Sequence, residues 1–151
     1  MRHFKDLSAL AAQVGQEVAV TDWVTVTQQR INQFAEATGD HQWIHVDPDK
    51  ARGGPFGSTI AHGFLTLALI PQFFQSVLQV GHIGMAVNYG LNRVRFTAPV
   101  PVEARLRARL KLARCEVLPQ GAMQMAWDVT IEREHAERPV CLAESLVRYY
   151  P

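Results

Sequence analysis

The segment from residue 62 to residue 80 constrains the fold most strongly, because its apolar side chains cover nearly every face of a predicted helix. Only a buried helix is apolar all round. Pro71 falls inside the segment and is expected to kink or divide the helix. The chain must therefore form a structure that surrounds this helix. The apolar side chains are those of Phe64, Leu65, Leu67, Ala68, Leu69, Ile70, Phe73, Phe74, Val77 and Leu78.

The residues after Gly81 follow the two-residue period of β-strands. Apolar and polar residues alternate over 102–112 and again over 123–132. Such alternation is typical of antiparallel strands that have one buried face and one solvated face. The sequence predicts further strands over 85–91, 92–96 and 140–149, so four or five antiparallel strands follow the helix.

Three elements are expected before the long helix. They are a short amphipathic helix, a strand and a second helix, over 4–14, 22–26 and 28–37. Thr27 is placed to cap the second of these helices, and Gly39 to end it in a left-handed conformation. The segment 40–60 is mostly irregular, although Asp47 before Pro48 predicts one or two helical turns there.

The economical way to bury such a helix is to wrap a curved antiparallel sheet around it. We therefore predict an α+β structure with the hot-dog fold. The chain has 151 residues with no repeat or linker, and we expect a single domain over 1–151. A sheet of this kind has exposed edges, which favours a homodimer.

Composition excludes several classes of protein. The formal net charge is +1, which removes the electrostatic case for a nucleic-acid binder. The sequence contains no run of about 20 apolar residues, which is the length that a membrane-spanning helix needs. The N-terminus lacks the apolar core of a signal peptide, so the cytoplasm is the expected compartment. Cys115 and Cys141 cannot form a structural zinc site alone and are expected to be reduced.

Asp40 and His45 are the candidate acid/base residues. They lie five residues apart in a segment that follows a helix end. A carboxylate can orient an imidazole, and together they can activate water at neutral pH. Spacing alone leaves the plainer alternative open, in which Asp40 is a turn residue and His45 is structural.

Ala61, His62 and Gly63 open the predicted long helix. A helix start presents free N–H groups, and a glycine lets a ligand carbonyl approach them closely. This is what an oxyanion hole for a thioester requires. The alternative is a small residue packed under the loop, with His62 as a helix cap or loop anchor.

Two blocks, TVTQQRINQFAEATGDHQWIHVDPDKA and GPFGSTIAHGFLTLALIPQF, resemble the MaoC-like dehydratases, the (R)-specific enoyl-CoA hydratases. Their usual motif is Gly-Asp-x-Asn-Pro-(Ile/Leu/Val)-His, then Asp, then Ala. The chain departs from it at Gln42, where Asn is usual, and at Trp43, where Pro is usual. With these two changes the motif is similar to that of the nodulation-protein-N-like branch of the family. A third block, NYGLNRVRFTAPVP, also resembles this branch. The motif residues that it keeps are Gly39, Asp40, Ile44, His45, Asp47 and Ala51.

The resemblance implies a hydro-lyase of fatty-acid metabolism that reversibly hydrates trans-2-enoyl thioesters. Asp40 and His45 would hold the reacting water, and the N–H of Gly63 would stabilise the enolate. No metal or redox cofactor is implied, because coenzyme A is part of the substrate. The expected partners are an acyl-CoA or acyl-carrier-protein thioester and a second copy of the chain, with no nucleic acid and no membrane.

Substrate contacts are expected from Ala61 and His62 and from residues of the third block and the last strand. Asn88, Tyr89 and Asn92 could meet the amides of the pantetheine arm, although the two asparagines could equally close a turn or bulge around Gly90. Arg93, Arg95 and Arg148 could meet the phosphates of CoA, although a solvated strand residue is the simpler interpretation of each. The basic stripe Arg105, Arg107, Arg109 and Lys111 could attract an acidic carrier, but a plain solvated face is the simpler interpretation.

Two other classes of function fit the same expected fold. A hot-dog thioesterase would use a carboxylate near the helix start to hydrolyse the thioester, and it would not need His45. A non-catalytic acyl-thioester-binding subunit would need neither acid/base residue, so the presence of both Asp40 and His45 counts against it.

Overall fold

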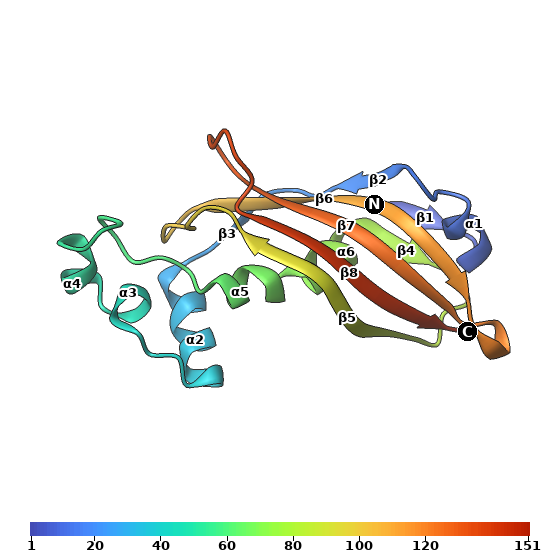
Figure 1. Ribbon diagram of the computed structural model, residues 1–151, viewed down its shortest axis with the longest axis horizontal. Coiled ribbons are helices and arrows are strands. Elements are labelled where there is room, and N and C mark those ends of the chain that lie inside the picture. Colours follow the sequence, from blue (N-terminus) through green and yellow to red (C-terminus); the bar gives the residue numbers. More distant parts are fainter.

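The computed structural model describes all 151 residues. A curved sheet of six antiparallel strands covers a broken central helix (Figure 1). The strand order is β2-β6-β7-β8-β5, and the short β3 also pairs with β6. The strands are β2 (Glu17–Val20), β3 (Val24–Thr25), β5 (Met85–Phe96), β6 (Arg105–Val117), β7 (Met123–Arg133) and β8 (Cys141–Tyr150).

The concave face of the sheet forms the core. In β6 the apolar residues of the predicted alternation, from Leu106 to Leu112, have no exposed surface. In β7 the fully buried Trp127 packs edge-on against Phe74 of the central helix, with ring centroids 5.0 Å apart. The predicted packing of a sheet around a helix is confirmed.

The central helix is divided into two, as we predicted from the position of Pro71. It consists of α5 (Gly63–Ala68) and α6 (Ile70–Val77), and Pro71 occupies the first turn of α6. Pro71 cannot donate to a carbonyl one turn earlier, so the chain breaks at Leu69. The prediction of a helix buried on every side is wrong at Phe64, which is 69% exposed.

The N-terminal predictions were only partly correct. The expected helix over 4–14 is much shorter, because α1 spans Leu7–Ala11 and is capped by Asp6. The chain before it forms β1 (Arg2–Phe4), which pairs in parallel with β4 (Leu78–Val80) where the long helix was expected to continue. The expected strand over 22–26 is reduced to β3. The longer β2 was not predicted.

Three helices lie together at one end of the sheet, where α5 begins (Figure 1). The first, α2 (Gln28–Thr38), has the predicted Thr27 cap and ends at Gly39 in the left-handed conformation, with φ 77°. The third, α4 (Pro48–Arg52), has the predicted Asp47 cap. Between them lies α3 (Trp43–Val46), which was not predicted.

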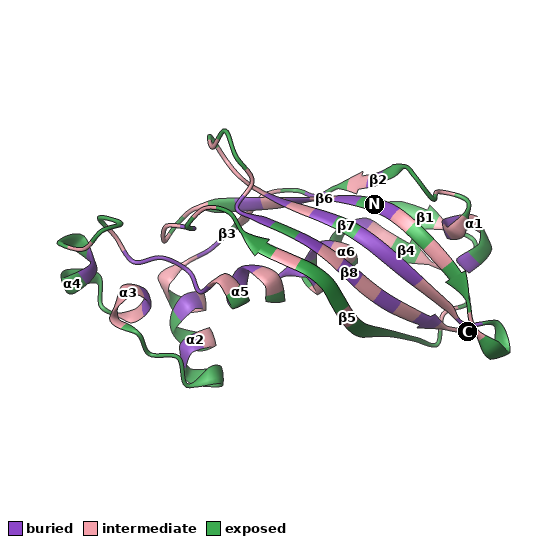
Figure 2. Cartoon of the chain, viewed as in Figure 1, coloured by how far each residue is buried: buried purple, intermediate pink, exposed green.

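The edge strand β5 has no partner on its outer side. It is one continuous strand of 12 residues, where two were expected. Figure 2 shows it exposed along almost its whole length. Its pairing with β8 shifts register between Asn88 and Gly90 and again between Leu91 and Arg93. The strand is therefore irregular on both sides of Gly90, as the bulge interpretation predicted, and substrate contacts of Asn88 and Asn92 stay a prediction.

The convex face of the sheet is polar and internally paired. Arg107 and Arg109 both bind Glu132, at 2.7 and 2.8 Å, and Arg105 binds Glu134 at 2.9 Å. The arginines of the basic stripe are thus paired with carboxylates on a partly exposed face, which agrees with the simpler interpretation of a solvated face. Both cysteines are free thiols. None of the helices has the length and apolar character needed to cross a bilayer.

Candidate active site

Asp40, His45 and His62 meet at the end of the sheet where α5 begins. One carboxylate oxygen and one nitrogen from each ring all lie within 4.8 Å of one another. A water that accepts or donates hydrogen bonds of about 2.8 Å can bridge two atoms at such a separation. The spacing of the predicted acid/base pair therefore allows both side chains to hold one water molecule.

The orientation of His45 is fixed by main-chain carbonyl groups. It lies in α3, and its Nδ1 is 2.7 Å from the carbonyl oxygen of Ile60. A carbonyl oxygen only accepts, so Nδ1 carries the hydrogen and Nε2 is left with its lone pair. Ile60 is itself held because its N–H donates to Ile44 and the N–H of Ala61 donates to Val100.

The environment of His45 favours its neutral form. The residue is 6% exposed, and this burial lowers the pKa of His45 below its ordinary value of 6.5. The hydrogen bond to Ile60 and the charge of Asp40 oppose the shift, while nearby His62 adds to it. A buried, neutral imidazole with a free Nε2 is suited to accept a proton from water.

Asp40 is the exposed member of the pair. Its side chain is 52% exposed and follows the left-handed Gly39, which turns the chain out of α2. The main-chain oxygen of Asp40 lies 2.9 Å from Nε2 of His62. The carboxylate is thus half-exposed to solvent, while the main chain of Asp40 is hydrogen-bonded to the buried side chain of His62.

Gly63 begins α5 beside a cavity of about 380 Å³, which His45, Ala61 and Gly63 help to line. Its N–H is among those at a helix start that have no partner within the helix. A Cβ at this position would lie 2.8 Å from Cδ2 of Phe96, so the ring of Phe96 requires a glycine here. The group that lies close to Gly63 in the structure is a side chain of β5, which is the packing alternative, and the approach of a ligand carbonyl stays a prediction.

The cluster does not fit a metal ion. The rings of His45 and His62 are stacked, with centroids 3.9 Å apart and planes 24° apart. The lone pairs of stacked rings lie in nearly parallel planes and do not converge on one point. One nitrogen of each ring also faces a carbonyl oxygen. This arrangement of the three side chains favours proton transfer over coordination of one metal ion.

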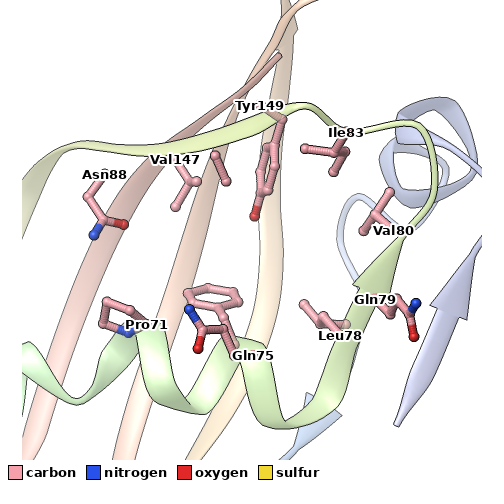
Figure 3. Close-up of a pocket in the computed structure, with 11 residues that line it drawn as sticks. Pro71, Gln75, Leu78, Gln79, Val80, Ile83, Asn88, Val147 and Tyr149 are labelled. Carbon is pink, nitrogen blue, oxygen red and sulfur yellow. The ribbon is translucent and has the colours of Figure 1, made fainter. Parts of the chain in front are cut away.

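The other predicted substrate contacts lie away from this cluster. Asn88 and Phe96 belong to the same strand and are about 26 Å apart along it, at about 3.3 Å per residue. Asn88 lines a different cavity of about 470 Å³, between α6, β5 and β8, where it and Tyr149 point toward the helix (Figure 3). Within one chain, Asn88 therefore does not reach Asp40 and His45.

Tyr89, Asn92 and Arg148 do not reach the cluster either. Arg148 stacks over the ring of Tyr89 at 3.4 Å and donates to Gln124 at 2.9 Å. In β8 it alternates with the buried Val147 and Tyr149, so it lies on the convex face. Asn92 sits in the second register shift of β5. In a single chain these residues lie on strands away from the cluster. Their predicted role in binding substrate would therefore require a site formed with a second chain.

Sequence reasoning missed the residues that support His45. Gln28, in the first turn of α2, donates to the main-chain oxygen of His45 at 2.8 Å and accepts from Thr59. Ile60 contributes only a carbonyl group, so no side-chain pattern could reveal its role. A glutamine after a capping threonine carries no distinctive signal.

Comparisons with known proteins agree with this architecture. Residues 9–132 match the family described as the MaoC like domain. The 3-hydroxyacyl-thioester dehydratase Z of Mycobacterium tuberculosis is 53% identical over 149 residues, which cover 99% of each chain. Nodulation protein N of Rhizobium leguminosarum is 39% identical, covering 99% of this chain and 95% of that protein.

A solved structure extends the similarity to three dimensions. The unliganded (R)-hydratase of Pseudomonas aeruginosa superposes with a TM-score of 0.69 and 28% identity, covering 91% of this chain and 81% of that one. Together with the sheet and its central helix, this match confirms the predicted hot-dog fold.

Proposed function

Since the chain belongs to the MaoC-like dehydratase family, we propose that it is a hydro-lyase that interconverts trans-2-enoyl and (R)-3-hydroxyacyl thioesters. The observation that carries this proposal is the approach of Asp40 and His45 to within 4.8 Å in a site open to solvent on one side. The thioester brings its own coenzyme A or carrier protein, and no further cofactor is proposed.

In the proposed mechanism, Asp40 and His45 hold one water molecule between them. As the water oxygen bonds to C3 of the enoyl group, its proton passes to the pair, and electron density moves onto the thioester oxygen. A proton then returns to C2 on the same face and the carbonyl re-forms. The net change is the addition of one water across the double bond.

The start of α5 stabilises the negative charge in this step. The N–H of Gly63 donates to the thioester oxygen as it becomes an enolate. Losing one such donor commonly costs about 100-fold to 1000-fold in rate. Ala61 lines the same cavity as Gly63.

The test is the hydration of crotonyl-CoA and octenoyl-CoA, followed by loss of the enoyl-thioester absorbance, with the chirality of the product determined. Formation of the (R)-3-hydroxyacyl product supports the proposal. An (S) product contradicts it, as does release of free thiol without hydration, which is the thioesterase outcome.

We also propose that the protein forms a homodimer through β5. This strand is an unpaired edge of 12 residues, and Met85, Tyr89 and Leu91 on it are 52%, 53% and 44% exposed. Unpaired edges of this length are open to pairing with another strand. A second copy can satisfy the edge by a two-fold, self-complementary contact.

The dimer would give Asn88 its predicted role. Antiparallel pairing of two β5 strands about a two-fold axis near their middle brings the Asn88 end of one strand beside the Phe96 end of the other. Because Phe96 lies against Gly63, Asn88 of one protomer would approach the partner's cavity. The substrate contacts expected from β5 would then come from the neighbouring chain.

A further inference from the structure

His62 has no step in the mechanism above, yet it touches both members of the acid/base pair. It is 2% exposed and immediately precedes α5. Its ring stacks on His45, with centroids 3.9 Å apart. Its Nε2 lies 2.9 Å from the main-chain oxygen of Asp40. One buried ring therefore links two residues that come from different elements.

The hydrogen bond fixes the tautomer of this ring. The carbonyl oxygen of Asp40 can only accept, so Nε2 of His62 carries the hydrogen. Nδ1 is buried and has no hydrogen-bond partner. The arrangement suits one task, donation from Nε2 to Asp40.

We propose that His62 is a positioning residue, whose Nε2–H fixes the main chain at Asp40 and whose ring face fixes the ring of His45. The inference rests on the proposed hydration. It assigns His62 a role other than substrate binding, because its Nε2 is committed to Asp40 and its Nδ1 makes no polar contact.

The surroundings of His45 allow this role to be measured. From α2, the uncharged Gln28 reaches the main chain of His45, and Phe34 packs on His62. The charged or titratable groups that act on His45 are Asp40 and His62. Burial and His62 both lower the pKa of His45. Replacing the His62 ring by a smaller uncharged side chain weakens both effects, so the pKa of His45 should rise.

Two variants separate the hydrogen bond from the ring. The side-chain amide of His62→Gln reaches the position of Nε2 and can still donate to Asp40. The amide of His62→Asn is one methylene shorter and cannot. Both remove the stacked ring. We expect kcat with crotonyl-CoA to be at least about tenfold lower for His62→Asn than for His62→Gln, with KM similar in both.

The second readout is the titration of His45 followed by NMR, which needs no substrate. We expect the pKa of His45 to be higher in both variants than in the wild type. His41→Gln is the matched control, because His41 is half-exposed, follows Asp40 in the chain, and has a ring nitrogen 3.7 Å from Glu36. This control should change neither kcat nor the titration of His45.

The proposal is overturned if His62→Gln and His62→Asn lose activity equally, if the titration of His45 does not move, or if His62→Gln fails to fold. A wild type without hydratase activity contradicts the proposed function instead. The NMR titration then still decides whether His62 positions His45.

Discussion

At the scale of single residues, catalytic competence depends on which nitrogen of His45 is free. The carbonyl of Ile60 occupies Nδ1 and leaves Nε2 with its lone pair. Burial keeps the ring neutral by lowering its pKa. The neighbouring Asp40 is half-exposed and supplies the second contact for water. The pair thus combines a buried acceptor with a solvent-facing carboxylate.

The lowered pKa of His45 has a consequence for the pH profile. The neutral ring is the active form, so kcat/KM should fall on the acid side with a midpoint below 6.5, the ordinary pKa of the group. Below pH 6.5 the unfolded chain binds this proton more readily, so acidification also lowers stability. The measurement is kcat/KM for crotonyl-CoA from pH 5 to pH 8. A midpoint above 6.5 would argue against a neutral, buried base.

The sequence motif predicted the acid/base pair but not its supports. Asp40 and His45 stand in a recognisable motif, and the structure brings them together. The contacts that orient His45 come from a carbonyl and from a distant helix, and neither leaves a pattern in the sequence. His62 was interpreted as a cap or substrate contact because its stacking on His45 depends on tertiary packing.

At the scale of elements, the long strands were predictable and the short elements were not. Alternation over 102–112 and 123–132 has enough repeats to identify β6 and β7. α3 has only four residues, too few for a helical period, although it carries His45. The contact of Gly63 with Phe96 joins the start of α5 to the end of β5, two elements that are far apart in the sequence.

This contact predicts the effect of Gly63→Ala. The added Cβ would lie 2.8 Å from the Phe96 ring, so this ring must move, and its movement changes the shape of the cavity that it lines. The N–H of residue 63 is retained. We expect kcat/KM for crotonyl-CoA to fall by about tenfold to a hundredfold. Adding Phe96→Leu should restore part of the loss, because the smaller side chain makes room. Equal activity of the single and double variants would contradict this steric explanation.

At the scale of the whole molecule, the sheet has a polar convex face and one edge strand, β5, that has no partner. The charged side chains of the convex face form ion pairs with one another, such as Arg109 with Glu132. In contrast, β5 and the 69% exposed Phe64 leave apolar surface in contact with solvent. Residues predicted to bind substrate lie on this edge, out of reach of their own site. A second chain accounts for both observations.

Light scattering of a β5 variant tests the dimer. Leu91→Lys places a charge in the proposed seam and should shift the protein from dimer to monomer. Val117→Lys is the matched control, because Val117 is 72% exposed at the end of β6, away from β5. The control should remain dimeric. A wild-type monomer, or a dimer that is unchanged by Leu91→Lys, would contradict the proposed interface.

The central claim is that Asp40 and His45 together activate one water molecule. Its most direct test is the rate of crotonyl-CoA hydration by Asp40→Asn and His45→Gln, with folding and oligomeric state checked for each. Asp49→Asn serves as the control, since Asp49 is an exposed carboxylate in α4. We expect each site variant to lose at least about a hundredfold in kcat while the control keeps wild-type activity. Near-normal turnover in either site variant would contradict the account.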